Sequence, residues 1–149
     1  MNELNQWGQE VIRKAMEYAN YEWYATERNV MHGVDDNGVE VDTPDITWKG
    51  EVLDCGWWET NQKNIGIPYG WGNASTIEEF EKGIAEGKYA GNVPEDKSRN
   101  MSYQSVGVDC SGLLTVCWDL PRKISTHIIP DYAFVIESID EIQQIGRAH

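Results

Sequence analysis

Residues 106–118 read VGVDCSGLLTVCW and constrain the possible folds of this chain more than any other stretch. A helix is expected to start near Cys110, and Pro121 cannot continue it, so these two positions bound one short helix. The apolar positions of that helix share one face, at Leu113, Cys117 and Leu120, with Leu114 beside it. The chain must therefore bury a short apolar helix whose first turn carries a thiol, at Cys110.

The position of Cys110 suits a nucleophile. The unpaired N–H groups and the dipole of a helix N-terminus favour the thiolate, and the same groups can hold an oxyanion. Gly112 leaves the first turn open to close approach by another segment. A lone helical cysteine is more often structural than catalytic, and Cys117, two turns on, is predicted to lie in the core. Cys55 follows no helix start, and no role is predicted for it.

Composition excludes several classes of function. The 149 residues suit one domain, and a formal net charge of −13 disfavours a nucleic-acid partner, whose phosphates need clustered Lys and Arg. No apolar run is long enough to cross a membrane, and no export signal is visible, so the cell wall, the exterior and the cytoplasm all stay open. Three cysteines without a C-x-x-C pair argue against a disulfide framework or a zinc site, and neither metal nor cofactor is expected.

The remaining patterns predict an α+β class. In chain order we expect an amphipathic helix over 4–27, a turn at 35–38, short strands at 39–41 and 46–48, an ordered loop over 55–73, a helix over 76–86 and a surface loop over 88–107. The helix over 76–86 begins with a capping box, T-I-E-E, and Gly87 suits its C-terminal cap.

Two sequence blocks carry a resemblance to a known family. D-C-S-G at 109–112, followed by LLTVCW, and I-P-Y-G-W-G-N at 67–73 resemble, in this order, two motifs of the NlpC/P60 cysteine peptidases. The resemblance implies a papain-like fold with Cys110 as the nucleophile. It also implies a substrate pocket that involves Tyr69, Trp71, Asp109 and Ser111. The substrates implied are γ-D-glutamyl–diamino-acid amides of peptidoglycan stem peptides, or related amides, cleaved without a cofactor.

The chain departs from the family pattern between the two blocks. Asn73 stands where the pattern has its second glycine, a change that is expected to touch no chemistry. Residues 74–107 make the gap unusually long, and this insertion could border the cleft. A surface elaboration is the favoured interpretation, because loops tolerate insertions.

The general base is the missing part of this site. A cysteine hydrolase needs an imidazole within hydrogen-bond reach of the thiol. His32 is predicted to lie in a surface turn, and His127 comes too early to match the family's histidine. His149 is the last residue. No histidine of this chain is therefore expected to serve as the catalytic base.

The C-terminal residues read IGRAH, which is what the string ATC GGA AGA GCA CAC would encode, and that string matches the start of a widely used sequencing adapter. We expect residues 145–149 to be non-native, 60–144 to be a partial catalytic domain and 1–59 to be an N-terminal helix and short hairpin region. A half-domain of this kind would lack most of the family's core sheet, so this product is expected to be inactive. The apolar face at Leu113, Leu114 and Cys117 would then lack its cover.

Two other functions remain open from the sequence. Trp57, Trp58, Trp71 and Tyr69 cluster and could stack on sugar rings, which would make the chain a cell-wall or carbohydrate-binding module. A core or groove lining is the favoured interpretation of these aromatics. A cytosolic amidase or transferase on the same fold, acting on a small amide, is the third possibility, and it fits the lack of a visible export signal.

Overall fold

The structure, a computed structural model, describes residues 3–49, 56–97 and 100–133. The elements in chain order are α1 (Glu3–Asn20), β1 (Glu22–Tyr24), the 3-10 turn η1 (Glu27–Asn29), β2 (His32–Val34), β3 (Glu40–Asp42), β4 (Lys63–Ile65), α2 (Ile77–Glu86), β5 (Tyr89–Ala90), β6 (Ser105–Val106), α3 (Cys110–Cys117) and η2 (Ile129–Asp131). The mixture of helices and short strands confirms the α+β class. None of the described helices is both long and apolar enough to pass through a membrane.

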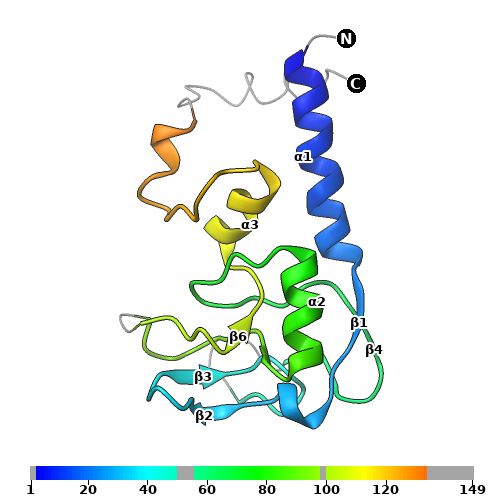
Figure 1. Ribbon diagram of the computed structural model, residues 1–149, viewed down its shortest axis with the longest axis vertical. Coiled ribbons are helices and arrows are strands. Elements are labelled where there is room, and N and C mark those ends of the chain that lie inside the picture. Colours follow the sequence, from blue (N-terminus) through cyan, green and yellow to red (C-terminus); the bar gives the residue numbers. More distant parts are fainter. Residues whose placement is uncertain (1–2, 50–55, 98–99, 134–149) are drawn as a thin grey trace.

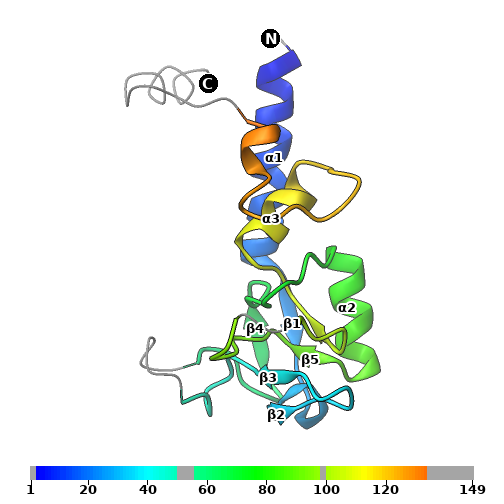
Figure 2. The same cartoon turned by 90° about the vertical axis from the view of Figure 1, so that its left-hand side faces the viewer.

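The strands form three small two-stranded sheets. β1 pairs antiparallel with β4, β2 pairs antiparallel with β3, and β5 pairs parallel with β6. Both ribbon views place α1 at one end of the molecule, α3 beside it, α2 with β5 and β6 in the middle, and β2 and β3 at the other end (Figures 1 and 2).

The core forms where α2 packs on the short strands. Trp23 of β1 makes edge contacts with Phe80 of α2 and with Trp58, at centroid separations of 5.1 and 5.5 Å. Ala25, Ala90 and Val106 complete the buried cluster. Edge-to-face aromatic pairs add attraction to the large apolar area they bury. β1 pairs with β4 and shares this core with α2. The segment before residue 60, which contains β1, and the segment after it, which contains β4 and α2, therefore stabilise one another.

The first helix ends earlier than the sequence indicates. We expected it to run to residue 27, but α1 stops at Asn20. The N–H of Ile67 donates to the carbonyl of Tyr18 (2.9 Å), and the N–H of Gly66 donates to that of Tyr21 (2.8 Å). These distant donors take carbonyls that another helical turn would use, and Trp23 then enters the core as part of a strand.

Three other expected segments also differ from the structure. Residues 46–48 form a turn rather than a strand, because the Asp45 carboxylate accepts the Thr47 N–H (2.8 Å). The expected loop over 55–73 contains β4. The expected surface loop over 88–107 begins and ends in the core, since β5 and β6 pair there and bury Ala90 and Val106.

The local signals were confirmed. The Thr76 hydroxyl accepts the Glu79 N–H (3.1 Å), the Glu79 carboxylate accepts the Thr76 N–H (2.9 Å), and Gly87 caps α2 with a φ of 84°. Asp35 and Gly38 close the expected turn, and β3 lies within one residue of the strand predicted at 39–41.

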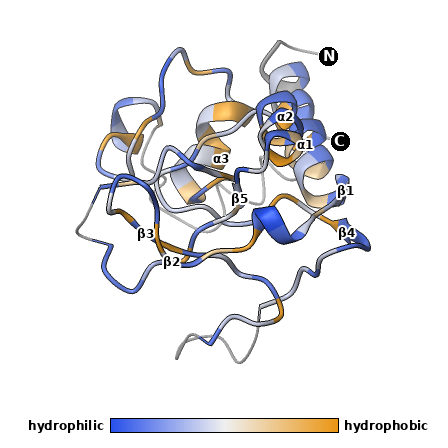
Figure 3. Cartoon of the chain, turned by 60° about the horizontal axis from the view of Figure 1, so that its bottom comes forward, coloured by the Kyte–Doolittle hydropathy of each residue, from blue (hydrophilic) through white to orange (hydrophobic). Residues whose placement is uncertain are grey.

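The short apolar helix α3 is covered by α1. Its hydrophobic residues are visible as orange segments in Figure 3. Trp118 at its end packs against Trp7 of α1, with ring centroids 6.1 Å apart, and Cys117 is 3% exposed. The expectation that this face lacks its cover is therefore wrong for Cys117, and Leu113 and Leu114 are partly buried.

Candidate functional site

The two sequence blocks meet in space. The segment 68–75 wraps around the segment 105–109, and backbone hydrogen bonds join them. The N–H of Gly70 donates to the carbonyl of Val108 (3.1 Å), the N–H of Val108 donates to that of Pro68 (3.1 Å), and the N–H of Ser75 donates to that of Gly107 (3.0 Å). The start of α3 is thus fixed against the loop that carries Tyr69 and Trp71.

Asp109 is the centre of this junction. One carboxylate oxygen accepts the Gly112 N–H (2.6 Å) and the Ser111 hydroxyl (3.1 Å), as a helix cap does. The other accepts the Gly72 N–H (3.0 Å) and the Lys123 ammonium (2.9 Å). Asp109 is only 6% exposed. Both oxygens are occupied, so Asp109 and Ser111 position the helix, and the substrate contact expected of them stays a prediction.

Gly112 and Asn73 explain how the blocks fit so closely. The N–H of Asp109 donates to the carbonyl of Asn73 (3.0 Å), and that same carbonyl oxygen would lie 2.0 Å from a Cβ at position 112. The Asn73 side chain is buried, where its amide oxygen accepts the Ser105 hydroxyl (3.0 Å) and its amide nitrogen donates to the Ser105 carbonyl (3.2 Å). Asn73 therefore holds the loop in place, a role that its position in the motif did not reveal.

Cys110 lies at the first position of α3 with its side chain exposed to solvent. The Gly112 N–H is bound by Asp109, and the Leu113 N–H is bound by the Asp109 carbonyl. Within residues 3–49, 56–97 and 100–133, no acceptor binds the N–H groups of Cys110 and Ser111. Two helix-start donors thus remain beside an accessible thiol, which is the arrangement that stabilises an oxyanion.

Cys117 differs from Cys110 in its exposure to solvent. It is buried beneath α1, and burial raises the pKa of its thiol, with Asp119 adding to the rise and Lys14 opposing it. A buried neutral thiol is inert. The prediction that Cys117 is a core residue is confirmed, and Cys55 lies outside the described residues.

Tyr69 and Trp71 are both partly buried. Burial is the largest cause that raises the pKa of Tyr69, and the charges of Asp109 and Cys110 raise it further, which places the phenol close to both groups. Lys97, from the insertion between the two blocks, lies over these rings, with its Nζ 5.8 Å from the Tyr69 centroid and 6.0 Å from that of Trp71. The insertion therefore borders this site and is more than a remote surface elaboration.

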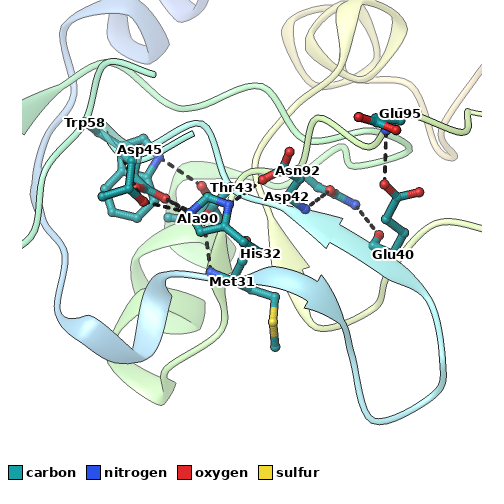
Figure 4. A network of polar contacts seen from close by, with 11 residues as sticks. Met31, His32, Glu40, Asp42, Thr43, Asp45, Trp58, Ala90, Asn92 and Glu95 are labelled. Atoms are coloured by element: carbon teal, nitrogen blue, oxygen red, sulfur yellow. Dashed lines mark hydrogen bonds and ion pairs between the residues drawn. The ribbon is translucent and has the colours of Figure 1, made fainter. Parts of the chain in front are cut away.

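His32 lies in strand β2 and not in a surface turn, so that prediction was wrong. Its Nδ1 contacts the Asp42 carboxylate, and its Nε2 lies 3.0 Å from the Asp45 carboxylate and 2.9 Å from the Thr47 hydroxyl (Figure 4). Hydrogen bonds to the Asp42 carboxylate and the Thr47 hydroxyl, with the ionic contact to Asp45, hold the ring in place, and both of its nitrogens are engaged. The network joins the β2–β3 hairpin to the turn at 43–47.

An open hollow of about 510 Å³ adjoins this network, lined by His32, Gly33, Glu40, Val41, Asp42, Thr47, Lys49 and Glu95. Most of its lining residues belong to β2 and β3, which lie away from α3 in both ribbon views (Figures 1 and 2). We place the candidate site at Cys110 instead, because an exposed thiol and unused N–H donors meet there and the Tyr69 ring lies close by.

The other histidines supply no base within the described residues. His127 is exposed and makes no hydrogen bond to Cys110, and His149 lies outside the described residues. Among the described residues that follow α3, Lys123 is the one whose side chain returns to the start of that helix, where it contacts Asp109. No sequence motif marks this lysine. Its contacts depend on the return of the chain past Pro121, which the sequence pattern does not encode.

The aromatic residues that could stack on sugar rings do not form one continuous surface. Trp58 is fully buried, and its indole N–H donates to the Ala90 carbonyl (3.1 Å), so it cannot stack on a ligand. Trp57 is 47% exposed and packs edge-on against Trp23. Tyr69 and Trp71 both lie under the Lys97 ammonium, and Tyr69 is close to Cys110.

Two further findings concern metal binding and similarity to known proteins. In the part of the chain that the structure describes, no group of three or more His, Cys, Asp or Glu side chains could hold a metal ion. No family model, curated protein or solved structure matches this chain.

Proposed function

We propose that this chain carries the nucleophile of a cysteine peptidase that cleaves γ-D-glutamyl–diamino-acid amides of peptidoglycan stem peptides. One observation supports it above the others: the G-W-G-N and D-C-S-G blocks, 36 positions apart, lie against each other and leave Cys110 exposed. The resemblance to NlpC/P60 peptidases rests on these same two blocks, and it supplies the substrate class.

The reaction follows from the thiol and its neighbours. The Cys110 thiolate attacks the amide carbonyl carbon, and the N–H groups of Cys110 and Ser111 stabilise the oxyanion. The C–N bond breaks and the amine leaves with a proton from a general acid. Water then attacks the thioester, which releases the carboxylic acid and restores the thiol. The base that takes the thiol proton is a group other than His32, whose ring nitrogens are both engaged.

Trapping with a peptidyl electrophile tests this proposal without requiring complete turnover. A γ-D-glutamyl acyloxymethyl ketone should alkylate Cys110 and leave Cys117 unmodified, as seen by mass spectrometry of the digested chain. The unmodified dipeptide should slow the labelling by competition. Cys117→Ala is the matched control and should label normally, whereas Cys110→Ala should not label.

A panel of substrates distinguishes the proposed peptidase from the amidase alternative. Hydrolysis of a γ-D-glutamyl–diamino-acid dipeptide, abolished in Cys110→Ala, would support the peptidase and would overturn the expectation that this chain is inactive. Hydrolysis of small amides alone would favour the amidase alternative. Labelling of Cys110 that is no faster with the glutamyl electrophile than with a scrambled one would contradict the proposal, because the site would then not recognise the peptide.

A further inference from the structure

Lys97 is the feature of this site that neither sequence block contains. It belongs to the segment between them, yet its ammonium lies over the rings of Tyr69 and Trp71, about equally far from both centroids. Cation–π attraction at this range in a solvent-exposed place is weak. The rings therefore hold the Lys97 charge loosely enough for a ligand to recruit it, and one of them, Tyr69, lies close to Cys110.

The two lysines at the site differ in their partners. Lys123 is paired with the Asp109 carboxylate at 2.9 Å. Among the described residues, no carboxylate lies within ion-pair distance of Lys97, and its side chain is exposed. The Lys123 ammonium is neutralised by Asp109, whereas the Lys97 ammonium faces the space above the rings of Tyr69 and Trp71.

The overall charge makes this local cation informative. A chain with a formal net charge of −13 repels anionic ligands at long range. A substrate carboxylate would gain a charge-assisted hydrogen bond from Lys97, which is stronger than the ring contact it replaces. A neutral ligand would gain nothing comparable from the same side chain.

We propose that Lys97 is a specificity-determining residue that binds a carboxylate of the substrate beside Tyr69 and Trp71, so that the site selects acidic peptides. This inference rests on the proposed function, because Cys110 defines where the substrate lies. It assigns the insertion a direct part in substrate choice.

A ligand pair that differs by one charge tests the inference. The Cys110→Ala chain, which binds without turnover, is titrated with a γ-D-glutamyl dipeptide and with the same dipeptide carrying an α-carboxamide. The acid should bind more tightly than the amide. Adding Lys97→Met should weaken the acid about tenfold and leave the amide almost unchanged, and Lys97→Arg should retain the preference.

Lys82→Met provides the matched control, since it removes the same charge from the exposed face of α2. It should leave both affinities unchanged, and circular dichroism should confirm that every variant is folded. Equal weakening of acid and amide by Lys97→Met, or no effect on either, would overturn the role of Lys97 alone. Failure of both ligands to bind the folded chain would overturn the proposed function and the inference together.

Discussion

The carbonyl oxygen of Asn73 occupies the space that a side chain at Gly112 would need: a Cβ there would lie 2.0 Å from it. Backbone cannot yield as a flexible side chain can, so Gly112→Ala must push the 70–73 loop away from α3. We expect a loss of about 1–3 kcal/mol in the free energy of unfolding, measured by urea denaturation.

Gly8→Ala is the matched control for that substitution. Gly8 lies in α1 with no atom within 4 Å of the added methyl, so alanine should stabilise the chain by up to about 1 kcal/mol through helix propensity. If Gly112→Ala and Gly8→Ala changed stability alike, the close contact of the two blocks would not exist.

Acid sensitivity should arise partly at Asp35. Burial alone would raise the pKa of Asp35, but hydrogen bonds from the Ser102 hydroxyl (2.6 Å) and from the N–H groups of Val39 and Asn37 outweigh it and hold the pKa below its ordinary value. A folded pKa below the unfolded one stabilises the native state above the unfolded pKa. That contribution disappears as pH falls through the folded pKa.

Asp35→Asn should therefore lower the free energy of unfolding by about 1–2 kcal/mol near neutral pH and have less effect at low pH. Urea titrations between about pH 7 and pH 2 would show a flatter acid limb in the variant. Asp36→Asn changes a neighbouring exposed carboxylate and should leave the shape of the curve intact. A curve for Asp35→Asn parallel to that of the native chain would refute this assignment.

Local signals in the sequence determined what could be predicted. The cap at Thr76 was predicted because a side chain satisfies an N–H only three residues away, and the Asp109 cap, which was not predicted, is an interaction of the same local kind. The core position of Cys117 followed from helical periodicity. These interactions depend on neighbours along the chain, so a reader of the sequence can find them.

The remaining features depend on contacts between distant residues. Trp23 belongs to a strand because β4 pairs with it some forty residues later. The ring of His32 is engaged only because the chain turns back at Asp45, and Lys97 and Lys123 reach the site through loops without a regular pattern. Tertiary pairing overrode helix periodicity after Asn20, and no single-sequence signal marks such pairing.

The His32 network should stabilise the β2–β3 end of the molecule. His32→Ala removes the contacts to Asp42 and Asp45, and leaves Asp45, which is 2% exposed, without one of its donors. We expect a loss of about 1–2 kcal/mol in unfolding free energy, together with faster amide exchange in β2 and β3. His127→Ala, at an exposed position, should change stability by less than about 0.5 kcal/mol. Equal effects of the two substitutions would contradict the network.

Thiol reactivity should separate the two described cysteines. Iodoacetamide should alkylate Cys110 in the native chain, because its side chain is exposed, and should reach Cys117 only on unfolding. Peptide mapping with and without urea gives both rates in one sample. Rapid native labelling of Cys117 would mean that α1 does not cover α3 in solution.

The ion pair between Asp109 and Lys123 should be worth measurably more than a surface pair. Asp109→Asn keeps a capping side chain but loses the charge, and Lys123→Met removes the partner ammonium. Because the Asp109 carboxylate is 7% exposed and Lys123 is 30% exposed, we expect a coupling of about 1 kcal/mol from the double-mutant cycle in urea. The exposed pair Glu22–Lys63 is the matched control and should couple by less than about 0.5 kcal/mol. If the two cycles gave the same coupling, Asp109 would not anchor the segment after α3, and the loop blocks would owe their contact to the backbone bonds and Gly112 alone.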